Sequence, residues 1–122
     1  RDMAVSQLVG DWAARVSFPG EMTLCIQNIP RSCTRSELMN AIAHLGFGFA
    51  YDYLRMDRDH TSGDGASVVY INMISGESAR AFVQALADLQ VAGSSFRVAA
   101  AEVQGLAANL ARRLSPPAAL AR

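Results

Sequence analysis

Strand-like and helix-like patterns alternate along this chain in an order that few folds satisfy. Residues 22–27, 50–56, 67–73 and 97–103 have the alternating or β-branched character of strands. Apolar residues recur at helical spacing between the first and second of these segments and between the third and fourth. The predicted order is therefore β-α-β-β-α-β, in a chain of 122 residues, which suits one domain.

Local signals mark the expected helix boundaries. Thr34 and Glu37 form a capping box that begins the first helix, and Gly46 ends it. Ser75 is positioned to cap the second helix. This order predicts the α+β, ferredoxin-like βαββαβ sandwich, in which two helices cover one face of a four-stranded antiparallel sheet. The plan hosts enzymes, regulatory domains and RNA binders, so it does not give a function.

Further helical patterns flank this unit, which we place at residues 21–105. Residues 3–16, within a flanking segment 1–20, predict an amphipathic helix. Its Trp12 either packs on the domain or anchors a partner.

A short helix with a basic tail is expected in residues 106–122, where Leu106, Leu110 and Leu114 form one apolar stripe. We expect this helix to lie partly over the open sheet face, because so short a helix is marginal alone in water and must pack on another part of the domain. Arg112 and Arg113 would then lie at the rim of that face.

The charge balance excludes a globally basic nucleic-acid binder. Eleven basic residues, all of them arginine, match eleven acidic ones. Residues 21–105 carry a net charge of −3 and residues 106–122 carry +3, so phosphate affinity must come from small clusters or the tail. The exclusive use of arginine reflects either genomic base composition or selection for bidentate phosphate contacts.

The sequence has no run of ~18 apolar residues, so we expect no transmembrane helix. It also shows no signal-peptide pattern. We therefore expect a monomeric domain of a longer intracellular protein, nuclear or cytoplasmic.

The residues that could carry catalysis do not converge in the sequence. His44 and His60 lack a cysteine or serine partner at a recognisable spacing. Cys25 and Cys33 form no zinc pattern and are expected to be reduced thiols. The acidic loop that begins at Asp57 lacks the glycine and the final glutamate of a calcium loop. The sequence thus predicts no catalytic site, no metal site and no cofactor.

One sheet face is the better candidate for a site. If the alternate residues of the central strands form the core, then Cys25, Gln27, Val68, Tyr70 and Asn72 point to the open face. Tyr70 is then an aromatic residue at the sheet centre. It either stacks on a ligand or lies half-buried under a flanking helix, and both interpretations remain open.

Several segments resemble the C-terminal RNA recognition motif of the Mei-two-like RNA-binding proteins. These are Thr23 to Pro30 (T-L-C-I-Q-N-I-P), Tyr51-Asp52-Tyr53, Tyr70-Ile71-Asn72 with Ser75, and Gln104-Gly105. The similarity covers roughly residues 22–112. It implies binding of single-stranded RNA, whose bases stack on the two central strands.

The chain departs from that family at several contact positions. Cys25 stands where the family has Met, Ala66 to Val68 replace a basic-Gly-aromatic start, and Glu102 replaces a basic residue. The loss of two of three base-stacking side chains should weaken the free energy of RNA binding by ~2–6 kcal/mol relative to a full motif. The alternative is a degenerate motif that contacts protein.

The predicted RNA contacts are Cys25, Gln27, Asn28, Arg31, Tyr53, Arg55, Val68, Tyr70, Asn72 and Gln104. Two of them depend on the expected hairpin of residues 50–56 with 67–73, whose register would place Tyr53 beside Tyr70 and Arg55 beside Val68.

Overall fold

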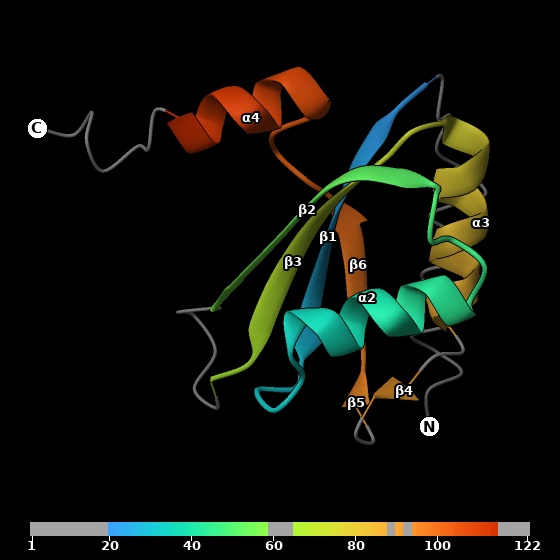
Figure 1. Ribbon diagram of the computed structural model, residues 1–122, viewed down its shortest axis with the longest axis vertical. Helices are drawn as coiled ribbons and strands as arrows, with labels where there is room; N and C mark the ends of the chain where they lie inside the picture. Colours follow the sequence, from blue (N-terminus) through green and yellow to red (C-terminus); the bar gives the residue numbers. More distant parts are fainter. Residues whose placement is uncertain (1–19, 59–64, 88–89, 92–93, 115–122) are drawn as a thin grey trace, which may run out of the picture.

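A four-stranded antiparallel sheet forms the centre of the molecule, with the strand order β2-β3-β1-β6 (Figure 1). The computed structural model describes residues 20–58, 65–87, 90–91 and 94–114. The strands of the sheet are β1 (Met22–Ile29), β2 (Tyr51–Arg58), β3 (Ser67–Met73) and β6 (Arg97–Ala100). The helices of the described residues are α2 (Arg35–His44), α3 (Gly76–Ala87) and α4 (Leu106–Leu114).

The main core lies between the sheet and the two helices α2 and α3. Leu38 and Ile42 of α2 and Phe82 of α3 are buried in one cluster with Leu24 and Ile71 of the central strands. Both helices therefore cover the same face of the sheet, as the sequence predicted. The protein is an α+β structure compatible with a ferredoxin-like fold.

The predicted helix starts are confirmed. The Thr34 hydroxyl accepts a hydrogen bond from the Glu37 N–H at 3.1 Å, and the Glu37 carboxylate accepts one from the Thr34 N–H at 2.9 Å. Ser75 caps α3, because its hydroxyl oxygen accepts from the Ser78 N–H at 3.0 Å. Each cap satisfies backbone donors that have no partner within the first helical turn.

The predicted hairpin of β2 and β3 exists, but its predicted register is wrong by two residues. Arg55, and not Tyr53, lies opposite Tyr70, while Tyr53 lies opposite Asn72 and Val68 lies opposite Asp57. The ladder continues to the pair of Arg58 with Ser67, beyond the expected end of the second strand at residue 56. A shift of two residues keeps every side chain on its predicted face and moves it along the strand.

Two irregularities shape the strand ends. Asn28, with a positive φ of 68°, lies where the β1–β3 register shifts between Ile26 and Ile29. Asparagine tolerates this conformation better than most residues, so it suits a bulge. Another shift in register at Asp52 separates Tyr51 from Tyr53 in β2.

The last strand is shorter than predicted. It ends at Ala100 and not at residue 103. A small pair of strands, β4 (Gln90–Val91) with β5 (Ser94–Ser95), precedes it and was not predicted from the sequence. The helix predicted after Gly105 is confirmed as α4. The predicted N-terminal helix and the end of the basic tail lie outside the described residues. In the described part of the chain, each helix is too short or too polar to cross a bilayer.

Candidate functional site

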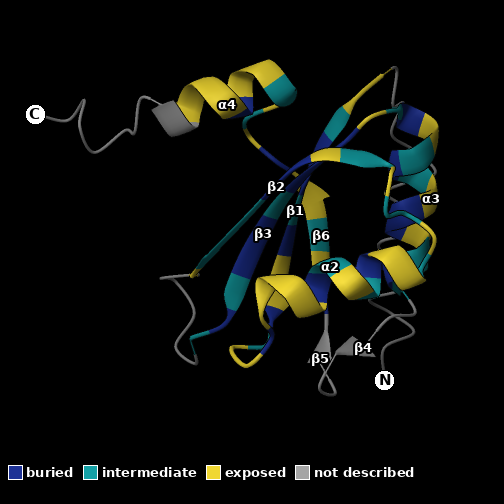
Figure 2. Cartoon of the chain, viewed as in Figure 1, coloured by how far each residue is buried: buried dark blue, intermediate teal, exposed yellow. Residues whose placement is uncertain are grey.

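Helix α4 lies on the sheet face opposite α2 and α3 and is attached there by Asn109. The Asn109 amide donates to the Thr23 hydroxyl oxygen at 3.1 Å and to the Gly105 carbonyl at 2.7 Å. Asn109 is the only buried residue between positions 106 and 112, and the rest of that stretch is wholly or partly exposed (Figure 2). Asn109 is therefore the buried side chain through which this part of the helix docks on the sheet.

The apolar stripe of α4 does not make this contact. Leu110 is 43% exposed and Leu106 is half-buried, while the Leu114 side chain lies outside the described residues. The prediction that α4 lies over the sheet face is confirmed, since α4 contacts β2 and Asn109 bonds β1. The prediction that leucines seat it is wrong for Leu110, and the buried side chain that contacts the sheet is instead the amide of Asn109.

The sheet residues under the start of α4 form a buried polar network. The Thr23 hydroxyl donates to the Asn72 side-chain oxygen at 2.7 Å, and the Asn72 amide donates to Glu21 and Asp52 carboxylates, each at 2.9 Å. Thr23 and Asn72 are fully buried, so these bonds satisfy groups that would otherwise be costly to bury. We call Glu21, Thr23, Asp52, Asn72, Gln104 and Asn109 the Thr23 network.

Glu21 links this network to the helix. Its Oε1 also accepts a hydrogen bond from the Leu106 N–H at 3.1 Å, at the N-terminus of α4. The bonds from Asn72 and then from Leu106 lower the pKa of Glu21 below its ordinary value, because they favour the charged form. A carboxylate at a helix N-terminus is also favoured by the helix dipole.

Gln104 is occupied by backbone hydrogen bonds. Its amide oxygen accepts from the Thr23 N–H at 2.9 Å, and its amide nitrogen donates to the Thr23 and Ala101 carbonyls at 2.7 and 2.8 Å. The side chain thus replaces a further residue of β6 in pairing with β1. Because the Gln104 side chain takes the place of strand backbone next to Thr23, the last strand ends early.

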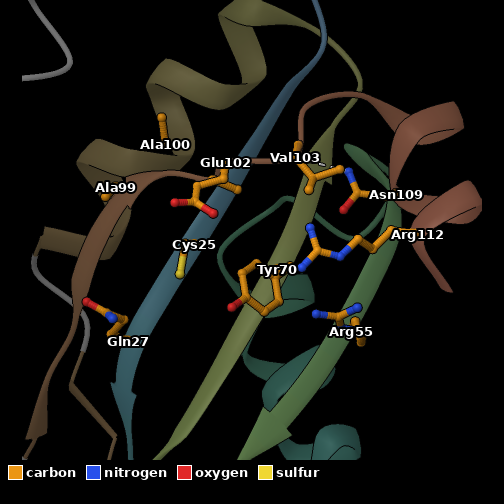
Figure 3. A pocket seen from close by; sticks show the side chains of 11 residues that line it. Cys25, Gln27, Arg55, Tyr70, Ala99, Ala100, Glu102, Val103, Asn109 and Arg112 are labelled. Atoms are coloured by element: carbon orange, nitrogen blue, oxygen red, sulfur yellow. Dashed lines mark hydrogen bonds between the residues drawn. The ribbon is translucent and has the colours of Figure 1, made fainter. Parts of the chain in front are cut away.

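Beside the Thr23 network, the same face is hollowed over the centre of the sheet (Figure 3). The hollow has a volume of about 320 Å³. Its lining comes from all four strands of the sheet, from the turn after β6 and from α4: Cys25, Gln27, Arg55, Tyr70, Ala99, Ala100, Ala101, Glu102, Val103, Asn109 and Arg112. We call this space the sheet hollow.

Tyr70 occupies the middle of the sheet hollow. It lies opposite Cys25 of β1 and Arg55 of β2, and Cys25 in turn lies opposite Ala99 of β6. These residues form one row across the sheet, since directly paired residues share a face. The small side chains of Cys25 and Ala99 leave space next to the tyrosine ring.

The cationic side of the hollow is formed by Arg55 and Arg112. The Arg55 guanidinium carbon lies 4.8 Å from the centroid of the Tyr70 ring. The Arg112 side chain reaches from α4 toward Tyr70, on the same side as Arg55 (Figure 3). Arg55 Nε also lies 2.9 Å from Asp57 Oδ2, but both side chains are partly exposed, so this ion pair is weak.

Four predicted contact residues, Cys25, Gln27, Arg55 and Tyr70, line the sheet hollow together. The remaining six are placed elsewhere. Val68 and Tyr53 lie on the predicted face but are each 6% exposed.

Two more of the six, Asn72 and Gln104, have their polar atoms engaged in the Thr23 network. Asn28 is exposed at the bulge in β1. Arg31 is exposed and lies beside Gly65. A Cβ atom added to Gly65 would lie 3.3 Å from the Cδ atom of Arg31.

Sequence reasoning did not place Glu102 or Asn109 in the site. Asn109 interrupts an apolar helix stripe, which was the available signal for a polar contact to the sheet. Glu102 follows the last strand, and the turn that carries it into the hollow depends on the Gln104 bonds to Thr23. Such bonds join residues about 80 positions apart and leave no local pattern.

The described residues contain no group of three or more histidine, cysteine or acidic side chains that could hold a metal ion. Cys25 and Cys33 are not joined in a disulfide. Burial, and then the nearby Glu37 charge, raises the pKa of the Cys33 thiol. Cys33 is thus a buried core thiol, while Cys25 faces the hollow. No protein-family model and no curated protein matches this chain.

Proposed function

We propose that this domain binds single-stranded RNA in the sheet hollow without a catalytic step, as an RNA recognition motif of the Mei-two-like type in an intracellular protein. The observation that carries the proposal is Tyr70, an aromatic side chain on a central strand, placed beside two arginines in a surface hollow. RNA recognition motifs stack bases on side chains of the two central strands of such a sheet. In this chain the central strands are β1 and β3.

The chemistry of the hollow suits a nucleotide. An RNA base stacks on an aromatic ring or on a guanidinium plane, and Tyr70 and Arg55 offer one of each within 4.8 Å. Arg55 and Arg112 are also positioned to contact a phosphate, which arginine binds with parallel N–H groups. The hollow holds few such groups, so we expect weak binding whose dependence on salt is modest, because the slope scales with the number of phosphate contacts.

The test is a titration of the protein against fluorescein-labelled single-stranded RNA of random sequence, measured by anisotropy at ~50 and ~200 mM salt. Tyr70→Ala should weaken binding by ~1–3 kcal/mol, the contribution of one base stack. Phe49→Ala is the matched control, because Phe49 is an aromatic residue that is 98% exposed and lies outside the hollow. A folded Tyr70→Ala protein with unchanged affinity would contradict the proposal.

A second candidate function is a protein-interaction module. Phe49 is almost fully exposed and Ile74 is half exposed, and the Ile74 N–H donates to the Ala50 carbonyl at 2.9 Å. Two apolar side chains are therefore presented at the same end of the sheet, away from Tyr70. RNA affinity that is absent, or that responds to neither Tyr70 nor salt, would favour this function.

A further inference from the structure

We infer that Glu102 reads the edge of the bound base and makes the hollow prefer guanine over uracil. This inference rests on the proposed RNA binding and concerns the specificity of the same site. Glu102 is exposed and lines the sheet hollow. In the described part of the chain, its carboxylate makes no hydrogen bond and no ion pair.

The position of Glu102 is held by its neighbours. The Ala101 N–H donates to the Thr23 carbonyl at 3.0 Å, and the Ala101 carbonyl accepts from the Gln104 amide at 2.8 Å. On the other side, the Val103 carbonyl accepts from the Asn109 amide at 3.4 Å. The backbone on both sides of Glu102 is thus tied to β1 and α4, and a recognition group needs such support.

Charge in the hollow is divided between two sides. Glu102 lies on one side of Tyr70, while Arg55 and Arg112 lie on the other (Figure 3). A phosphate is attracted by the guanidinium groups and repelled by the carboxylate. A nucleotide stacked near Tyr70 should therefore direct its phosphate toward the arginines and its base edge toward Glu102.

A carboxylate can only accept hydrogen bonds, so it selects among bases by the donors they present. The Watson–Crick edge of guanine carries two adjacent donors, N1–H and N2–H, which match the two carboxylate oxygens. Adenine and cytosine each offer one amino group beside an acceptor nitrogen. Uracil offers N3–H between two carbonyl oxygens, which the carboxylate repels. The expected order is guanine first, adenine and cytosine next, and uracil last.

The experiment uses four labelled RNA heptamers that are oligouridine except for a central G, A, C or U. All four carry the same backbone charge, so affinity ratios at one salt concentration report the base alone. The wild-type protein should bind the G heptamer at least about fivefold more tightly than the all-U heptamer, as expected for a bidentate contact. Glu102→Gln should bring this ratio close to one, because an amide has one acceptor and one donor group and can pair equally well with N1–H and O6 of guanine or with N3–H and O4 of uracil.

Glu77→Gln is the matched control, since it removes the same charge from an exposed position on α3, across the sheet. It should keep the wild-type ratio. Equal wild-type affinity for the four heptamers, or a preference that survives in Glu102→Gln, would overturn the inference and leave RNA binding intact. Failure of the wild-type protein to bind any heptamer would overturn the proposed function as well.

Discussion

The guanidinium carbon of Arg55 lies 4.8 Å from the centroid of the Tyr70 ring, and the two residues face each other across the β2–β3 ladder. A cation over an aromatic face contributes ~0.5–1 kcal/mol at an exposed site. The same contact places a positive charge beside the one aromatic residue that lines the hollow. Stacking and part of the phosphate binding are therefore expected to depend on this pair of residues.

Arg55→Gln should lower the dependence of RNA affinity on salt by about one unit in a plot of log affinity against log salt, because one phosphate contact is lost. Arg55→Lys should retain that slope yet bind more weakly, since lysine keeps the charge but lacks the planar group that stacks. Arg35→Gln, on α2 across the sheet, serves as the control. An unchanged slope in Arg55→Gln would show that Arg55 does not contact phosphate.

Cys25 offers a chemical footprint of the hollow. Iodoacetamide should alkylate Cys25 faster than Cys33, because Cys33 is 7% exposed and burial raises its thiol pKa. Saturating RNA should slow the alkylation of Cys25 and leave the rate at Cys33 unchanged. Mass spectrometry of the two cysteine peptides over time gives both rates. Equal Cys25 rates with and without bound RNA would place the RNA elsewhere.

Removal of residues 106–122 should expose the end of the hollow that α4 lines through Asn109 and Arg112. RNA analogues with a neutral backbone should then bind more tightly, since stacking becomes more accessible and arginine makes no contribution to their affinity. Ordinary RNA should lose part of its salt dependence together with Arg112. Asn109→Ala, which loosens the helix without deleting it, should shift affinity for the neutral analogues in the same direction. No gain in either variant would contradict a covering role for α4.

Stability should depend on pH through Glu21. Its pKa is lowered in the folded protein by the bonds from Asn72 and Leu106, so the folded state favours the charged carboxylate. This stabilisation is fully present above the ordinary pKa of glutamate and is lost as the pH falls through the lower, folded value. Thermal unfolding followed by circular dichroism should show that the melting temperature falls more steeply in acid for the wild type than for Glu21→Gln. Parallel pH profiles for the two proteins would show that Glu21 does not couple to folding.

The sequence predicted the elements well where the signal is local. The capping box of Thr34 and Glu37, the apolar face of α3 and the alternation in β3 each lie within a few residues, and the structure has all three. The face of each central strand followed from the same alternation, because successive side chains point to opposite sides.

Register could not be predicted in the same way. Both the expected pairing of Tyr53 with Tyr70 and the observed pairing of Arg55 with Tyr70 keep the same side chains on the open face. Burial alone cannot distinguish registers that differ by two residues. The observed register comes with an irregularity at Asp52, whose carboxylate accepts a hydrogen bond from Asn72.

By itself, the sequence determined the order of the main strands and helices and the two faces of each central strand, including the open face on which Tyr70 lies. Only the tertiary structure decided that Arg55 neighbours Tyr70, that Asn109 docks α4 and that Glu102 enters the hollow. Each of these depends on hydrogen bonds between distant segments, such as Thr23 with Asn72, Gln104 and Asn109. Those bonds form only when the folded sheet brings their donors and acceptors within about 3 Å.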